Sequence, residues 1–151
     1  RLTSTWTGNT GTHTSDYRAY SRDITVEIAG KPPLLASADK PFRGDLARWN
    51  PEDMLLAALS ECHLLSYLYV AVTAGVVMTD YRDDASGTMR EDGKGGGQFT
   101  EVVLRPHVTV ASADMVDAAT AAHQRANELC YIANSVNFPV RHEPVIRVAT
   151  A

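Results

Sequence analysis

The sequence predicts an α+β fold in which antiparallel sheets wrap around one long central helix. The chain of 151 residues has the size of one domain with its own core, so a single domain is expected over 1–151. Turn motifs and alternating apolar residues indicate strands near both ends, and the apolar segment 51–77 indicates a helix. One chain of this length has trouble covering such a helix on all sides, so we expect a dimer partner to complete the fold.

Composition and charge narrow the class of protein. Hydrophobic residues make up 44% of the chain and charged residues 21%, which excludes disordered, collagen-like and coiled-coil classes. A net charge of −4 without a cluster of basic residues disfavours nucleic acid as a partner. The most apolar run, Leu64–Met78, is shorter than the ~20 residues of a membrane span. Without an opening secretion signal either, a cytoplasmic protein with no membrane partner is expected.

The first fifty residues are expected to form an antiparallel meander followed by a loop. Strand-forming residues are separated by turn motifs at 8–11 and 30–33. The expected strands cover 3–7, 17–28 and 34–37. The polar segment 38–50 combines arginine and aspartate with proline and glycine, as functional loops often do.

The segment 51–77 gives the strongest helix signal. Asn50 is a preferred N-cap residue, and Pro51 suits the first helical position. Glu52 and Asp53 suit the positive end of the helix dipole. The following residues are apolar on nearly every face, which predicts a helix that is buried on nearly every side.

The rest of the chain is expected to return to strands around a second helix. The glycine-rich segment 92–97 is typical of a hairpin tip. The expected strands are 78–81, 88–91, 99–110 and 145–148, and the second helix is 113–129. Ser135 follows this helix in a segment where turn chemistry is the simplest interpretation.

Two cysteines are the residues most able to carry chemistry. Cys62 lies in the middle of the first helix, between Glu61 and His63, and Cys130 lies where the second helix ends. Each can be an inert core residue, and His63 can be a buried histidine with satisfied partners. Alternatively the two thiols form a redox pair, and sequence spacing does not decide between these interpretations.

A reactive thiolate needs a neighbouring cation. Arg43 and Arg48 lie just before the first helix, and Glu52 can orient an arginine or can simply be an acid at a helix N-terminus. Ten residues of straight helix separate Glu52 from Cys62 by ~15 Å. Both reach one site only if the helix breaks, or if the loop or a second subunit bridges the gap.

Metal, phosphate and serine-hydrolase chemistry lack their motifs. The histidines, at positions 13, 63, 107, 123 and 142, show no metal-ligand spacing, so no metal is expected. The sequence has neither a phosphate-binding glycine loop nor a nucleophile elbow. No cofactor is expected.

The segment Asn50–Cys62 resembles the signature N-P-E-[E/D/Q]-[L/M]-L-x-A-A-x-x-x-C of the osmotically inducible protein C / organic hydroperoxide resistance (OsmC/Ohr) family. The segment Cys130–Val136 resembles the distal cysteine motif of that family. The resemblance runs from Trp6 to Val148. After Cys130 the chain reads Tyr-Ile-Ala-Asn-Ser where well-known members have a proline-containing stretch, which suggests a less-studied branch.

The resemblance implies a Cys-based peroxidase that reduces organic hydroperoxides, with hydrogen peroxide as a further candidate substrate. It also implies an intertwined homodimer with active sites at the interface. It implies that Cys62 is the peroxidatic cysteine, that Cys130 is the resolving cysteine, and that Glu52 and Arg43 support them, with Arg48 as the second choice of arginine. It also implies an external dithiol reductant, of lipoyl type or a small thiol. The alternative is a non-catalytic dimeric binding protein for small apolar or oxidised ligands.

Overall fold

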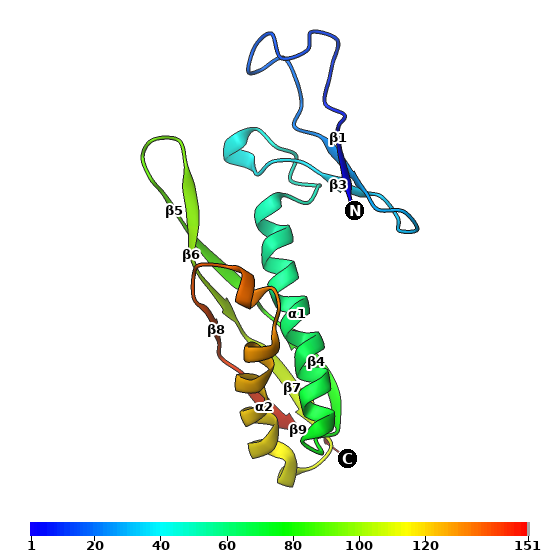
Figure 1. Ribbon diagram of the computed structural model, residues 1–151, viewed down its shortest axis with the longest axis vertical. Coiled ribbons are helices and arrows are strands. Elements are labelled where there is room, and N and C mark those ends of the chain that lie inside the picture. Colours follow the sequence, from blue (N-terminus) through cyan, green and yellow to red (C-terminus); the bar gives the residue numbers. More distant parts are fainter. Residues whose placement is uncertain (151) are drawn as a thin grey trace. The chain divides into compact units, whose positions relative to one another are not determined.

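The computed structural model describes residues 1–150, which form two compact units (Figure 1). The first unit is Arg1–Leu55, and the second begins at Leu56. Their helices and segregated strands confirm the predicted α+β class.

The first unit contains the predicted antiparallel meander of β1 (Thr3–Trp6), β2 (Ile24–Glu27) and β3 (Leu34–Ala36). The strand expected over 17–28 is wrong in its first half, because the segment before Ile24 is a loop organised by an arginine. The guanidinium of Arg22 donates to the carbonyl oxygens of Tyr17 and Tyr20 and lies 4.3 and 4.2 Å from the centres of their rings.

The start of the long helix α1 (Pro51–Thr73) agrees with the sequence analysis, but its end does not. The Asn50 side-chain oxygen accepts a hydrogen bond from the amide of Asp53 at 2.7 Å, as an N-cap does. The helix stops before the predicted 77, because Gly75 adopts a φ of 72°. The amide of Val76 then bonds the carbonyl of Ala71 at 2.9 Å, which closes the last turn.

The second unit contains two three-stranded sheets. One has the order β4-β7-β9, and the other has the order β5-β6-β8. Their strands are β4 (Met78–Asp83), β5 (Ser86–Glu91), β6 (Gly97–Leu104), β7 (Pro106–Val110), β8 (Val140–His142) and β9 (Val145–Val148). The pairs β6–β8 and β7–β9 are parallel, so both sheets are mixed where antiparallel ones were expected.

The single strand expected over 99–110 is wrong, because it divides at Arg105 between the two sheets. The amide of Arg105 bonds the carboxylate of Asp83 at 2.7 Å instead of a neighbouring strand. Pro106, which lacks a backbone N–H, then opens β7. The short strand β8 had no counterpart in the sequence analysis.

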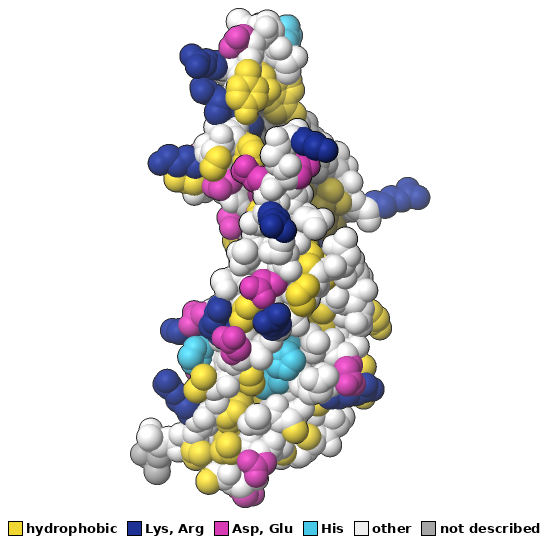
Figure 2. All heavy atoms as spheres, turned by 90° about the vertical axis from the view of Figure 1, so that its left-hand side faces the viewer, with side chains coloured by type: hydrophobic (Ala, Val, Ile, Leu, Met, Phe, Trp, Pro, Cys, Tyr) yellow, Lys and Arg dark blue, Asp and Glu magenta, His cyan; other side chains and the backbone are white. Residues whose placement is uncertain are grey.

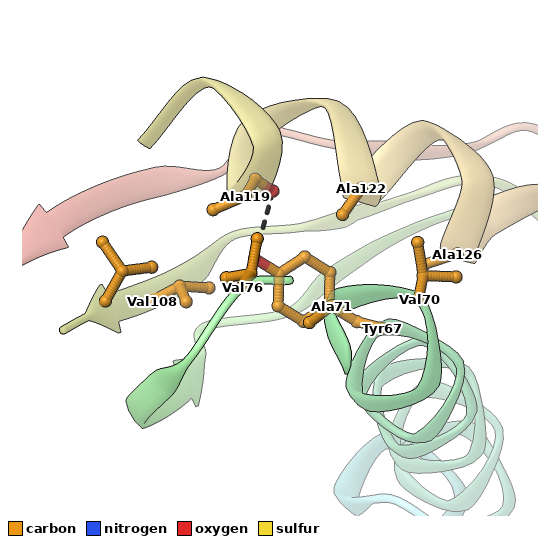
Figure 3. Close-up of a cluster of buried hydrophobic side chains, with 9 residues drawn as sticks. Tyr67, Val70, Ala71, Val76, Val108, Ala119, Ala122 and Ala126 are labelled. Atoms are coloured by element: carbon orange, nitrogen blue, oxygen red, sulfur yellow. Dashed lines mark hydrogen bonds between the residues drawn. The ribbon is translucent and has the colours of Figure 1, made fainter. Parts of the chain in front are cut away.

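The second helix is a 3-10 turn, Ala113–Met115, that runs into α2 (Val116–Leu129). Helices α1 and α2 pack through a buried cluster that Figure 3 shows in close-up. The Tyr67 ring of α1 points toward α2, and its hydroxyl donates to the carbonyl of Ala119 at 3.0 Å. Ala122 and Ala126 complete the facing surface of α2, and these small side chains let the helices approach closely.

Helix α1 is buried on one face and not on nearly every side, as was expected. Its buried residues are Leu59, His63, Tyr67, Val70 and Ala71. In contrast, Leu65 is 58% exposed, Tyr69 65% and Val72 76%. By length and composition alone, α1 could cross a membrane, a test that core helices of soluble proteins also pass. One apolar face of α1 is therefore uncovered in the single chain.

Several surface charges form ion pairs. Arg105 contacts Glu143 at 3.2 Å, and Arg125 contacts Glu128 at 2.8 Å. On the face shown in Figure 2, acidic and basic side chains alternate, and neither sign forms a broad patch. These pairs are exposed, so each contributes little to stability.

Candidate functional site

The two cysteines, far apart in the sequence, come together in the second unit. Cys62 lies in the middle of α1 and is half-buried, and Cys130 follows the last residue of α2 and is buried. Both are free thiols, and they lie close enough for the Cys62 thiol to raise the pKa of the Cys130 thiol. The fold therefore juxtaposes two residues whose sequence spacing left their relation open.

Cys130 is held as a neutral thiol. It is 1% exposed, and burial raises its pKa to about 11, with the neighbouring Cys62 thiol adding to the rise. The amide of Ala133 donates to the Cys130 sulfur at 3.3 Å and partly opposes this shift. At neutral pH this residue thus carries its proton and is a poor nucleophile toward an external oxidant.

The segment after Cys130 is a compact turn that fixes this cysteine. The amide of Asn134 bonds the carbonyl of Cys130 at 3.0 Å, and the Asn134 side chain donates to the carbonyl of Glu128. The Ser135 hydroxyl donates to the carbonyl of Tyr131 at 2.7 Å, which confirms the turn role expected for Ser135. The Asn-Ser pair therefore serves the geometry of the turn and not hydrolysis.

A pocket of about 500 Å³ opens beside Cys62. Side chains at helical spacing on α1 form one wall, and the end of α2 and the following turn form the other. The lining residues are Ala58, Glu61, Cys62, Leu65, Ser66, Tyr69, Leu129, Tyr131 and Ile132. Because aliphatic and aromatic groups dominate this lining, the pocket suits an apolar molecule that presents a reactive atom to Cys62.

Three histidines from three elements meet next to this pair of helices. His63 Nε2 of α1 lies 3.0 Å from His123 Nδ1 of α2, and both residues are 1% exposed. The ring centre of His142, in β8, lies 5.6 Å from that of His63 and 6.1 Å from that of His123. The Tyr67 ring stacks on His123 with 4.1 Å between ring centres.

These histidines are neutral in the folded protein. Burial lowers the pKa of His63 to about 4, and the nearby His142 adds to the effect. Burial also lowers the pKa of His123 to about 3, with repulsion from His63 and His142. Within the described residues, three buried ring nitrogens of the cluster have no hydrogen-bond partner, namely His63 Nδ1, His123 Nε2 and His142 Nδ1. His63 is therefore buried, as the sequence allowed, but only one of its nitrogens is satisfied.

The predicted arginines and glutamate belong to the first unit. Arg48 is held by Asp23 and Asp45, with 3.6 Å between charged atoms in each pair. The exposed Arg43 adopts a left-handed backbone with a φ of 63°, and among residues 1–150 its side chain forms no ion pair with Glu52. Glu52 lies in the first turn of α1, which continues unbroken to Cys62 and beyond. A break in the helix therefore does not bring Glu52 to Cys62. Bridging of the gap by the loop or by a second subunit stays a prediction.

In the part of the chain that the structure describes, no group of three or more His, Cys, Asp or Glu side chains is arranged to hold a metal ion. The histidine cluster does not form such a group, because two of its ring nitrogens already face each other across a hydrogen bond.

The sequence profile of the OsmC-like protein family matches residues 43–144, and the chain belongs to this family. An OsmC-like protein of unknown function from Vibrio cholerae O1 biovar eltor is 34% identical, with a TM-score of 0.85 over 96% of this chain and 97% of that one. No curated protein sequence matches the chain significantly.

More distant structures share the fold. An organic hydroperoxide resistance protein from Elizabethkingia anophelis is 17% identical, with a TM-score of 0.69 over 99% of this chain and 96% of that one. A putative organic hydroperoxide resistance protein from Vibrio cholerae, with captopril bound in one active site, is 21% identical, with a TM-score of 0.64 over 98% of this chain and 90% of that one.

Both cysteines were predicted from the sequence, but the histidine cluster was not. His63, His123 and His142 are widely separated and follow no ligand spacing. A signal existed only in part: His63 interrupts an apolar stripe, and His123 falls on the alanine-rich stripe of α2 that proves to be buried. The position of His142 could not be predicted, because it depends on the parallel pairing of β8 with β6.

Proposed function

We propose that the chain is a thiol-dependent peroxidase that reduces organic hydroperoxides through Cys62 and Cys130. The observation that carries this proposal is a free thiol, Cys62, in the wall of an apolar pocket with the buried free thiol of Cys130 next to it. Membership of the OsmC-like family and the names of the distant relatives support a peroxidase-like role. The apolar lining favours a hydroperoxide with an alkyl or aryl group.

The proposed reaction has three steps. The Cys62 thiolate attacks the distal peroxide oxygen, the O–O bond breaks, and a proton and the leaving alkoxide form an alcohol while Cys62 becomes a sulfenic acid. The Cys130 thiol then displaces the hydroxyl of that sulfenic acid, which gives a Cys62–Cys130 disulfide and water. An external dithiol, of lipoyl type or a small thiol, reduces the disulfide and is itself oxidised to a disulfide.

Burial supports this division of roles. Cys62 lines the pocket, where a peroxide can reach it. Cys130 is 1% exposed and has a raised pKa, so it remains a protonated thiol until Cys62 has been oxidised. The opposite assignment would require a peroxide to reach a sulfur beneath the protein surface.

We assign the support of the Cys62 thiolate to Arg43, with Glu52 orienting the guanidinium. Arg43 suits this role better than Arg48, because two carboxylates already hold Arg48. We also propose a cytoplasmic homodimer in which a second copy covers the exposed apolar residues of α1, such as Leu65 and Val72. The proposal requires no bound cofactor.

The direct test is turnover of cumene hydroperoxide by the purified chain with dihydrolipoamide as reductant. We expect consumption of the hydroperoxide by the wild type and none above background by Cys62→Ser, because serine is not nucleophilic at neutral pH. Cys62→Ser should fold as the wild type does, which circular dichroism checks. Turnover at the wild-type rate in this variant would reject the proposed chemistry.

The same pocket also favours a second candidate, a non-catalytic binding protein for small apolar or oxidised ligands. Only the peroxidase needs a thiolate at Cys62. A profile of the rate of Cys62 alkylation against pH separates the two: the peroxidase predicts fast alkylation already at neutral pH, and the binding protein predicts the profile of an ordinary thiol.

A further inference from the structure

The two helices that carry the cysteines also carry a buried pair of histidines. His63 directly follows Cys62 in α1, and His123 lies two turns before Cys130 on the buried face of α2. Among the residues that the structure describes, two hydrogen bonds join α1 to α2, namely His63 to His123 and Tyr67 to Ala119. The histidine contact is the one nearer to the thiols along both helices.

A hydrogen bond between two neutral imidazoles is directional in a way that apolar packing is not. One ring must donate and the other must accept, with 3.0 Å between His63 Nε2 and His123 Nδ1. Moving α2 along or away from α1 would break this bond and leave further polar atoms without partners in the interior, which is costly. The pair therefore fixes one register of the two helices.

We propose that His63 and His123 are positioning residues that hold Cys62 against Cys130, and that acid releases this hold. The inference rests on the thiol pair of the proposed function but not on its substrate. A first proton would put a charge into an interior without a compensating partner. A second proton would leave both facing nitrogens as donors and break the bond.

The surroundings favour release in acid. Tyr67 of α1 stacks on His123, Tyr81 of β4 contacts Tyr67, and His142 of β8 completes the cluster. Repulsion between these histidines, together with burial, opposes protonation, and among the described groups no carboxylate acts on either imidazole. On β4, the carboxylate of Asp83 accepts hydrogen bonds from the Ser60 hydroxyl and from the amide of Arg105. Separation of the helices would let both rings take up protons in water.

The test measures the equilibrium between the Cys62–Cys130 dithiol and glutathione disulfide in the full chain. Each reaction forms one protein disulfide and two glutathione thiols, and equilibrium is approached from both sides. At pH 7.5, we expect His63→Leu to lower the equilibrium constant for disulfide formation about tenfold, because the hydrogen bond is lost. His107→Gln, which changes a histidine that contacts Asp84 outside the cluster, is the control and should have no effect.

A double variant with His63→Gln and His123→Asn separates positioning from packing. The two amides replace the facing nitrogens and can still bond each other, but they do not titrate. We expect the double variant to lie within about threefold of wild type at pH 7.5. Between pH 7.5 and pH 5.0 the wild-type constant should fall about fivefold further than that of the double variant. Effects of pH that the two proteins share cancel in this comparison.

The inference is overturned if His63→Leu stays within twofold of wild type, or if wild type and the double variant show the same dependence on pH. If His63→Leu does not fold, the comparison with the double variant decides alone. Because the assay contains no hydroperoxide, its outcome is separate from that of the proposed function. If the chain shows these effects but does not reduce cumene hydroperoxide, the peroxidase proposal is rejected. The positioning role of the two histidines is then still supported.

Discussion

The thiol of Cys62, in the middle of α1, lies close to the thiol of Cys130 at the end of α2, and the more buried of the two, Cys130, has its pKa raised to about 11. The half-buried member lines the pocket. This difference in burial suits a pair in which Cys62 reacts with the oxidant first and Cys130 reacts only afterwards, with oxidised Cys62. It defines the roles that the following predictions test.

Replacing Cys130 should stop the cycle after the first oxidation. In Cys130→Ser the sulfenic acid on Cys62 has no thiol to condense with, so it persists and then oxidises further. Mass spectrometry after addition of one equivalent of cumene hydroperoxide should show one or two added oxygens on Cys62. Multiple turnover with dihydrolipoamide at the wild-type rate would mean that Cys130 is only a packing residue.

Arg43 should matter for rate and Arg48 for stability. Arg43→Ala is expected to slow the peroxide reaction about tenfold or more, because a thiolate loses its cation, and Arg43→Lys should restore only part, since lysine lacks the planar fork. Glu52→Ala should slow the reaction less, through lost orientation of the arginine. Stopped-flow measurement of Cys62 oxidation checks all three.

Arg48→Ala is the matched control for the loop arginine. Its contacts with Asp23 and Asp45 suggest a structural role in the first unit, so a modest loss of stability is expected with little change in rate. If Arg48→Ala disables the reaction and Arg43→Ala does not, then the choice of arginine is wrong. If neither variant slows the reaction, an Arg–Glu pair does not activate Cys62.

Stability should fall in mild acid because of the buried histidines. The ordinary pKa is 6.5, while burial lowers that of His63 to about 4 and that of His123 to about 3. Between these limits the unfolded chain binds protons that the folded chain does not, so the free energy of unfolding falls as the pH falls from 6.5 toward 4. Each histidine contributes a slope of up to ~1.4 kcal/mol per pH unit.

Urea unfolding at pH 7, 6 and 5 measures this slope. Other groups, including carboxylates, also titrate in this range, so the informative quantity is the difference between wild type and the variant with His63→Gln and His123→Asn. The variant should lose less stability with each unit of acidification. Parallel stability curves for the two proteins would show that the buried histidines are protonated as easily in the folded chain as in the unfolded one.

The exposed apolar face of α1 should be covered by a second copy. Val72 is 76% exposed in the single chain, and a charge there should disrupt a dimer interface. Light scattering at micromolar concentration should give the mass of a dimer for wild type and for the control Gln124→Glu on α2, and a shift toward monomer for Val72→Glu. A folded wild-type monomer would remove the case for a shared interface.

Local sequence signals predicted the elements well where a specific residue controls the geometry. Asn50 and Pro51 marked the start of α1 because cap and first-turn chemistry is local. The end of α1 was misplaced because its apolar pattern continues past Gly75, whose left-handed conformation ends the helix. The strand expected at 99–110 failed for a different reason, since the change of sheet at Arg105 depends on Asp83 from another strand.

The candidate site was only partly accessible from the sequence. Family resemblance pointed to Cys62 and Cys130, whose spacing alone said nothing about their distance. The contact between His63 and His123 depends on how α1 packs against α2, which no local pattern encodes. The burial of α1 was overestimated, because a helix that is apolar on all faces need not be covered on all faces by its own chain. A second chain can cover the face that remains.

The central claim is that Cys62 and Cys130 form a disulfide when the chain meets an organic hydroperoxide. The most direct measurement is the intact mass of the reduced protein after one equivalent of cumene hydroperoxide, with excess oxidant and reductant absent. The account predicts a mass lower by two hydrogen atoms, loss of both alkylatable thiols, and a disulfide-linked peptide that joins the two cysteines. An unchanged mass with both thiols still open to alkylation would contradict it.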